Sequence, residues 1–457
     1  MNRPGITLSA RTRSEPPNWL AEAKSAAALS GVKLTDLTDS NPTDHGLTDP
    51  AIIDVLARHL YEARRYRPDP RGWLPARQAL ADRFGGVPDD YWLTASTSEA
   101  YSWLFTVMAD PGDAVVAPAP GYPLVEPLAR FAGLNVVSYS SFYLHPHGWE
   151  LDMPSLTRWL GGRPPAAVWK LLGERSVRAV VAVNPNNPTG AYIAPTDAAR
   201  LGAACASAGV PIIADEVFFP FVLDGVAPHR VADSAGPHAV VATLDGLSKL
   251  LAAPQLKLGW IRLSGPPSQT AALARALETV ADAYLSVNSP AACALPALLE
   301  LADASAERIR ARCAANLATL RGLGDACRVR RTDGGWTALV DVPRLTDDDG
   351  LARRLLTKGL IAHPGWFYDL PDEGCLAVSL LPKPSRFQQM ARRVKSVVDG
   401  SGIEFVRAVW NSLDHSRLPI ADDYKQMIDR ALADLTANPR SAITAAKSVA
   451  RLRQITA

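Results

Sequence analysis

The strongest constraint on the fold is an alternation of short runs rich in valine and isoleucine with longer stretches rich in alanine and leucine. The short runs predict strands over 113–118, 135–140, 177–184, 210–216, 239–245 and 256–264, and most of the stretches between them predict helices. Because parallel strands need long crossover connections, this order predicts an α/β fold with a mostly parallel sheet between two layers of helices. Such a sheet binds its ligands at the carboxyl ends of its strands.

The pattern changes after about residue 285, where alanine-rich helical sequence extends over 290–323. Two further strand candidates, 336–342 and 375–381, follow, with a predicted helix near 350–359 between them. This order predicts a second, smaller α+β domain. We expect an N-terminal arm with part of the small domain over 1–48, a large domain over 49–300, a small C-terminal domain over 301–400 and a helical extension over 401–457.

The extension carries an apolar stripe at helical spacing, formed by Tyr424, Met427, Ile428, Ala431, Leu432 and Leu435. We expect this stripe to pack on the body of the protein or on a partner subunit. The extension mixes basic and acidic side chains, so its charge gives little indication of nucleic-acid binding.

Composition and charge indicate a small ligand rather than a polymer or a membrane. The 457 residues are 47% hydrophobic, and 48 basic against 46 acidic side chains leave a formal net charge of +2. This balance gives no electrostatic reason to expect nucleic acid or an anionic membrane as a partner. No apolar run is long enough to cross a bilayer, and residues 1–19 lack the apolar segment of a signal peptide, so we expect a cytoplasmic protein.

The cysteines give no sign of a disulfide framework or a metal site. They are scattered, with no CxxC pair and no nearby histidines at metal-ligand spacing. We therefore expect buried free thiols at Cys205, Cys293, Cys313, Cys327 and Cys375, and no bound metal.

Polar residues follow the predicted strands at the edge where a ligand would bind. The run NPNNPTG places Asn184 and Asn187 at the end of one strand, and ADEVFF ends the next strand in Asp215 and Glu216. A buried carboxylate needs a partner, and a protonated ring nitrogen would supply one. Taken singly, the first run could be only a turn, and the carboxylate pair could be a helix cap or a surface turn.

A third predicted strand leads to Lys249, which stands among leucines. Burial disfavours the charged form of a lysine and makes its amine a better nucleophile, so Schiff-base chemistry is the functional interpretation. Further upstream, Ser96, Thr97 and Ser98 precede a predicted helix, whose N-terminal amides could hold a phosphate. Any serine-rich helix cap gives a similar pattern.

Taken together and in this order, NPNNPTG, ADEVF and LSK followed by LGW resemble the pyridoxal-phosphate-dependent aminotransferases of class I/II. This family belongs to the fold type I superfamily, which includes aspartate aminotransferase, and the resemblance covers roughly residues 35–400. It implies a large domain with a mostly parallel sheet between helices, a smaller α+β domain, and pyridoxal 5'-phosphate (PLP) as the cofactor. It also implies amino acid and keto acid substrates and a homodimer.

The resemblance assigns the central roles to three residues. Lys249 is expected to form the internal aldimine with the cofactor. Asp215 is expected to pair with the pyridine nitrogen and keep the ring an electron sink, and Asn187 to hydrogen-bond the ring 3-oxygen.

Other positions match residues that surround the cofactor in the family. Tyr122, in APAPGYP, matches the aromatic residue that stacks on the ring, and Ser96, Thr97 and Ser98 match the phosphate loop. Tyr66, in YRPDPRGW, matches a tyrosine that reaches the phosphate of the neighbouring subunit's cofactor, which would make the active unit a dimer.

The sequence departs from the family at several cofactor positions. Lys257 stands where an arginine usually grips the phosphate, and it offers charge without the bidentate fork of a guanidinium. Phe218 stands where a tyrosine usually donates to the 3-oxygen. Gly246 replaces a serine that often precedes the lysine by three positions, although the adjacent Ser248 could compensate.

A further departure concerns the substrate. Ala377 falls where many members carry the arginine that binds the substrate α-carboxylate. Lys383 and Arg386 follow soon after, and Asn41, in DSNPTDHGL, matches a segment that usually lines the substrate pocket. For these three residues, surface charge and a turn are equally good explanations.

The function expected from these features is transamination, in which the freed amine of Lys249 moves a proton from the substrate α-carbon to the cofactor. A lyase, a decarboxylating deaminase or an oxidase acting on an amino acid derivative is the alternative, because one such scaffold hosts many reactions. A cofactor-binding transcriptional sensor is a different class, and only about 35 residues precede the matching segment, too few for a DNA-binding module.

Overall fold

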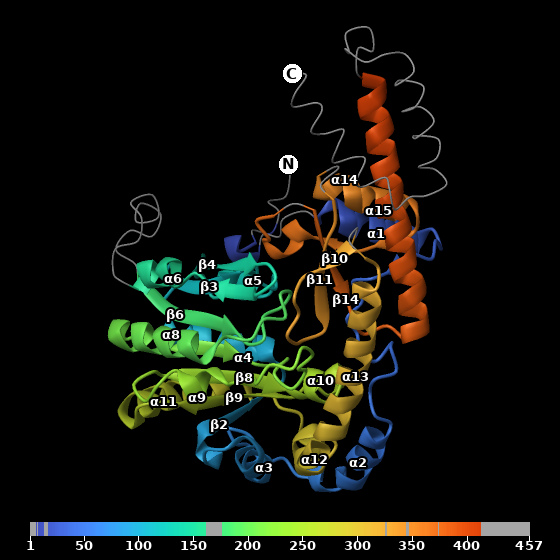
Figure 1. The fold of residues 1–457 in the computed structure, drawn as a ribbon. Coiled ribbons are helices and arrows are strands. Elements are labelled where there is room, and N and C mark those ends of the chain that lie inside the picture. The colour runs from blue at the N-terminus through green and yellow to red at the C-terminus, as the bar shows by residue number, and fades with distance from the viewer. Residues whose placement is uncertain are drawn as a thin grey trace, which may run out of the picture. The chain divides into compact units, whose positions relative to one another are not determined.

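The computed structural model describes residues 6, 8–12, 17–160, 176–324, 327–343, 347–372 and 374–412, and for 401–412 the backbone alone. The chain divides into two compact units (Figure 1). The first is built mainly from Ser40–Cys313 with Arg331–Thr337, and the second from Pro17–Asp39, Ala314–Arg330 and the chain from residue 338 onward. Two parts of the predicted small domain over 301–400, residues 301–313 and the segment Arg331–Thr337, therefore cluster with the first unit.

An eight-stranded mixed sheet forms the centre of the first unit. Its strand order is β2 (Tyr91–Thr94), β9 (Gly259–Ser264), β8 (Val241–Gly246), β7 (Ile212–Asp215), β6 (Val177–Val183), β3 (Ala114–Ala119), β4 (Asn135–Leu144) and β5 (Gly148–Leu151). The pairs from β8 through β7, β6 and β3 to β4 are parallel, whereas β9 pairs antiparallel with both of its neighbours and β5 antiparallel with β4. The predicted mostly parallel sheet is confirmed.

Both faces of this sheet are covered, which explains why its strands are continuously apolar. On β6, Ala179 and Val181 pack into one hydrophobic cluster, whereas Val180 and Ala182 pack into another. The first cluster includes side chains of α4 (Thr97–Met108), α5 (Val125–Phe131) and α11 (Pro267–Tyr284). The second includes side chains of α6 (Met153–Leu160), α8 (Pro195–Ala208) and α9 (Val231–Ser234).

The remaining helices of the first unit build a third cluster beside β2 and β9. It contains side chains of α2 (Ala51–His59), α3 (Leu74–Phe84), α10 (Leu247–Leu250) and α12 (Ser289–Leu299). The helix α13 (Ala302–Arg321) begins in this unit and continues into the second. Short 3₁₀ turns also occur: η1 (Ala10–Thr12), η2 (Glu62–Arg64), η3 (Pro88–Asp90), η4 (Pro254–Leu256) and, in the second unit, η6 (Gly365–Tyr368).

The second unit is an α+β assembly. Its four-stranded sheet has the order β10 (Arg328–Val329), β11 (Thr337–Asp341), β14 (Cys375–Ser379) and β13 (His363–Pro364), and β1 (Thr35–Asp36) pairs in parallel with β12 (Leu360–Ile361). Its helices are α1 (Trp19–Leu29), α14 (Asp348–Thr357) and α15 (Pro384–Ser412). The apolar stripe predicted between Tyr424 and Leu435 lies outside the described residues.

Two further predictions from the sequence can be compared with the described residues. All five cysteines are free and buried, as expected. No helix among the described residues is both long and apolar enough to cross a membrane.

Candidate functional site

The site residues lie at the carboxyl ends of three neighbouring strands. In the register of the sheet, Val183 of β6 pairs with Asp215 of β7, and Asp215 pairs with Leu244 of β8. The chain leaves β6 toward Asn187, ends β7 at Asp215 and leads from β8 into α10, which carries Lys249. Parallel pairing therefore brings three segments that are far apart in the sequence to one edge of the sheet.

Asp215 is held by two hydrogen bonds at this edge. The Tyr101 hydroxyl donates to its Oδ2 at 3.0 Å, and the Val217 N–H donates to its Oδ1 at 3.3 Å. Burial raises the pKa of Asp215 to about 6, against the lowering effect of these bonds and of the Lys249 charge. Tyr101, which sequence reasoning missed, belongs to an apolar helix face, and nothing in the local pattern separates it from an ordinary core aromatic residue.

The Lys249 amine lies in an aromatic environment. Its Nζ is 5.5 Å from the ring centroid of Phe218 and 5.0 Å from that of Trp336, and these two rings contact each other edge to face at 5.4 Å. Burial lowers the pKa of Lys249, although the nearby charge of Asp215 opposes this effect. An amine with a lowered pKa is more often neutral and nucleophilic.

Trp336 is the second site residue that sequence reasoning missed. It is 2% exposed and lies in Arg331–Thr337, the segment that clusters with the first unit although it is distant in sequence from the rest of it. The only sequence signal was its position at the start of a predicted strand, which assigned it to the small domain.

The two asparagines of NPNNPTG have different surroundings. The Asn184 side chain is fully buried and donates from Nδ2 to Glu216 Oε1 at 3.1 Å, while its Oδ1 accepts from the Ile193 N–H at 3.0 Å. Asn187 instead has a buried Oδ1 with no hydrogen-bond partner among the described residues. A buried amide oxygen without a partner is a group that a hydrogen-bond donor on a ligand or a water molecule would satisfy.

The serine-rich segment forms the N-terminus of α4, as its pattern predicts. Ser96 is the N-cap, and its Oγ accepts from the Glu99 N–H at 3.2 Å; Thr97 and Ser98 follow in the first turn. Gly259 of β9 approaches this segment so closely that an added Cβ would lie 3.3 Å from Thr94 Oγ1 and 3.4 Å from the Ser96 carbonyl carbon. The helix N-terminus offers amide donors and the positive end of the helix dipole.

Three predicted cofactor residues are more exposed or less engaged. Tyr122 is 50% exposed, and Ser248 is half-buried in α10. Lys257 is exposed and adopts a left-handed backbone (φ 50°), with its carbonyl accepting from Asn288 Nδ2 at 3.1 Å. This left-handed residue caps the end of η4, two residues before β9 begins at Gly259.

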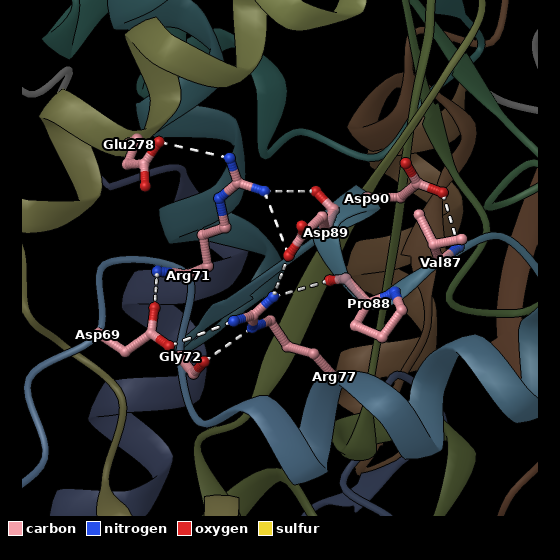
Figure 2. Close-up of polar contacts among 9 residues, drawn as sticks. All are labelled: Asp69, Arg71, Gly72, Arg77, Val87, Pro88, Asp89, Asp90 and Glu278. Carbon is pink, nitrogen blue, oxygen red and sulfur yellow. Dashed lines mark hydrogen bonds and ion pairs between the residues drawn. The ribbon is translucent and has the colours of Figure 1, made fainter.

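Tyr66 is 73% exposed and borders a hollow that is also lined by Arg67, Trp73 and Leu285. The following turn is fixed by two arginines (Figure 2). Arg77 donates to the Gly72 carbonyl at 2.8 Å and to Asp69 Oδ2 at 3.2 Å, and Arg71 reaches Glu278 at 3.4 Å.

The residues predicted to bind the substrate are two exposed basic residues and an exposed asparagine, and position 377 holds a buried alanine. Ala377 is buried in β14 and pairs in register with His363, while Lys383 and Arg386 are exposed. Asn41 is exposed, and its side chain closes a local turn by accepting from Thr43 Oγ1 at 2.8 Å and donating to Asp44 Oδ2 at 2.9 Å.

Comparisons with known proteins agree with this architecture. The family "Aminotransferase class I and II" matches residues 32–394. An alanine aminotransferase from Mycobacterium tuberculosis is 26% identical over 416 residues, covering 88% of this chain and 85% of that protein. An S-alkyl-thiohydroximate lyase from Arabidopsis thaliana is 27% identical over 263 residues, which is 56% of this chain and 53% of the lyase. Among solved structures, an aminotransferase from Escherichia coli superposes with a TM-score of 0.74 at 21% identity, covering 87% of this chain and 99% of that one.

Proposed function

The chain belongs to the class I and II aminotransferases, and we propose on this basis that it uses PLP to transfer an amino group from an amino acid to a keto acid. The observation that carries this proposal is the pair formed by Lys249 and Asp215 at neighbouring strand ends. Each influences the pKa of the other, and both lie in a partly buried site.

The residues present fit PLP in four respects. The N-terminus of α4 offers amide donors for the phosphate, and Asp215 offers a carboxylate for the pyridine nitrogen. Asn187 would donate from its amide nitrogen to the ring 3-oxygen, and its buried amide oxygen has no hydrogen-bond partner among the described residues. Lys249 offers an amine for the aldehyde carbon, and the bound cofactor would supply the electron sink that weakens the bonds at the substrate α-carbon.

Lys249 would act twice. With PLP bound, its Nζ would hold the aldehyde carbon of the cofactor, a role that the lowered pKa of this amine favours. When free, the same Nζ would be the base that takes the proton from the substrate α-carbon. Phe218 and Trp336, which lie over this amine, limit its access to water.

Asp215 would keep the pyridine nitrogen protonated. With a pKa of about 6, its carboxyl is mostly ionised at neutral pH, so it can pair with a cationic ring nitrogen. Tyr101 and the Val217 N–H hold the carboxylate in place and satisfy its oxygens. Tyr122 is proposed to stack on the ring, while Ser96, Thr97, Ser98, Ser248 and Lys257 are proposed to contact the phosphate.

The identity of the substrate is less constrained than the reaction. The M. tuberculosis relative is named an alanine aminotransferase, but the buried Ala377 means that the substrate carboxylate must be held by a group other than an arginine at this position. This departure and the similarity to a plant lyase make elimination from an amino acid derivative the second candidate. Decarboxylating deamination and oxidation remain further possibilities of the same scaffold.

A stoichiometry experiment separates transfer from elimination. The purified enzyme is mixed with a panel of amino acids and no keto acid. We expect one equivalent of keto acid per active site, no continuing ammonia release, and full turnover only when a keto acid acceptor is added. Continuing ammonia release without an acceptor would replace the aminotransferase proposal with the lyase.

We further propose that the enzyme is a cytoplasmic homodimer in which each subunit completes the site of the other. Tyr66 supports this proposal, because its side chain is largely exposed and stands beside a turn fixed by Arg71 and Arg77. An exposed tyrosine beside such a turn is well suited to contact a second subunit. No membrane or nucleic-acid partner forms part of the proposal.

A further inference from the structure

Three buried polar side chains that have no role in the proposed reaction lie next to the residues that do. Asn184, Glu216 and Asp245 are 0%, 0% and 2% exposed. Asn184 precedes Asn187 in the loop after β6, Glu216 directly follows Asp215, and Asp245 lies in β8 just before the helix that carries Lys249. Each therefore lies at the end of a strand that bears or leads to a proposed cofactor residue.

All three contact one short segment, His229–Val231, which leads into α9. Asn184 Nδ2 donates to the His229 carbonyl at 2.9 Å, and the Val231 N–H donates to Glu216 Oε1 at 2.8 Å. Arg230 lies between the two carboxylates: its Nη1 donates to Glu216 Oε2 at 2.7 Å, and its Nη2 is 3.9 Å from Asp245 Oδ2. The second oxygen of Asp245 accepts from the Gly246 N–H at 2.7 Å.

The environment of Arg230 suits a permanently charged, planar cation. Its side chain is 18% exposed, and its guanidinium lies 4.2 Å from the ring centroid of Phe219 and 5.5 Å from that of Phe84. Burial disfavours the charge, but the carboxylates of Glu216 and Asp245 raise the pKa of Arg230. Arginine stacks on aromatic rings and contacts two acceptors at once, which lysine does less well.

We infer that Arg230 is a positioning residue that ties the ends of β6, β7 and β8 together and thereby sets the relative placement of Asn187, Asp215 and Lys249. This inference rests on the proposed function. Without the guanidinium, two buried carboxylates lose their shared cation, and they must either take up protons or move apart. Either response changes the site around Lys249, because Asp215, Glu216 and Asp245 all lie at these strand ends.

The test compares Arg230→Met with Arg330→Met. Arg330 is a matched control because it is also buried, at 5% exposed, and also contacts two carboxylates, Asp341 at 2.7 Å and Asp372 at 3.4 Å, but it belongs to the second unit. Three quantities are measured for each variant. They are the Tm without cofactor, the Kd for PLP from absorbance titration, and the pKa of the nitrogen that would link Lys249 to PLP, which is read from the visible absorption band.

We expect both variants to lower Tm. Only Arg230→Met should weaken PLP binding, by about tenfold or more. It should also raise the pKa of the visible band by about half a unit, because a nearby positive charge is lost. Arg230→Lys should recover part of both changes. Asp245→Asn, which removes a negative charge from the same cluster and changes its shape little, should shift the band in the opposite direction.

The outcomes separate the inference from the proposed function. Wild-type PLP affinity and band pKa in Arg230→Met, or equal changes in Arg330→Met, would overturn the positioning role. If Arg230→Met does not fold, an unshifted band in Asp245→Asn would overturn it instead. A wild-type protein that shows no visible band with PLP would refute the proposed function and not the role of Arg230.

Discussion

At the scale of single residues, Lys249 and Lys257 differ in exposure, backbone conformation and surroundings. Lys249 lies against two aromatic rings with a lowered pKa, whereas Lys257 is exposed on a left-handed turn. This contrast supports a covalent role for the first and an electrostatic role for the second.

Replacing these lysines should therefore give different defects. Lys249→Ala should lower kcat by at least about a thousandfold, because it removes both the nucleophile and the proton carrier. Lys257→Ala should mainly raise the Kd for PLP, by about tenfold, because it removes one phosphate contact. Steady-state kinetics at saturating PLP distinguishes the two, and a Lys249→Ala enzyme with normal turnover would disprove its assignment.

Phe218 offers a second prediction at this scale. A phenylalanine cannot donate to the ring 3-oxygen, so the nitrogen that links Lys249 to the cofactor should hold its proton more tightly than it would beside a tyrosine. Phe218→Tyr should lower the pKa of the visible band in a spectrophotometric titration. Phe221→Tyr is a control at a neighbouring, fully buried ring. An unchanged or raised pKa in Phe218→Tyr would contradict the assignment.

Asp245 makes stability depend on pH. Burial raises its pKa to about 7 from an ordinary value of 3.8, so between these values the folded protein binds more protons than the unfolded chain. The contribution of Asp245 to stability is thus present at low pH and is lost as the pH rises through about 7. Urea unfolding of Asp245→Asn should show a smaller loss of stability than wild type between about pH 5 and about pH 8. An identical loss in both proteins would show that Asp245 does not titrate in this way.

At the scale of elements, the strand ends hold the site, and β9 supports the segment before α4. An added Cβ at Gly259 would meet the Asp245 carbonyl at 3.1 Å and Thr94 Oγ1 at 3.3 Å, so Gly259→Ala should displace the phosphate-binding segment by a few tenths of an ångström. We expect PLP affinity to fall by about fivefold or more, measured by absorbance titration. Gly400→Ala, where a Cβ would meet nothing within 4 Å, is the control. Equal affinities in the two variants would contradict this account.

The elements also show how far the sequence could be interpreted. The six strands predicted for the large domain are present. Their runs of valine and isoleucine pack against helices on both faces of the sheet, and such runs can be recognised in a short stretch of sequence. The strands β2 and β5 were not predicted, because four residues such as Tyr91–Thr94 are too few to show a period. The surroundings of the site could not be predicted either, since Tyr101, Arg230 and Trp336 reach it through contacts that are distant in sequence.

At the scale of the whole molecule, the proposed homodimer predicts complementation between two inactive variants. In a mixed dimer of Tyr66→Ala and Lys249→Ala subunits, one site has both wild-type residues and the other has neither, provided that Tyr66 acts across the interface. Random reassociation should restore about a quarter of wild-type activity, since half of the dimers are mixed and each has one intact site. Activity that stays at the level of the separate variants would place Tyr66 in its own subunit's site or outside any site.

Covalent trapping shows whether Lys249 carries the cofactor. The PLP-loaded enzyme is reduced with borohydride and digested, and the peptides are analysed by mass spectrometry. We expect one reduced pyridoxyl group per chain, on Lys249, and no label there when the protein is first saturated with a substrate amino acid. Label on Lys257 instead, or no label on either lysine, would contradict it.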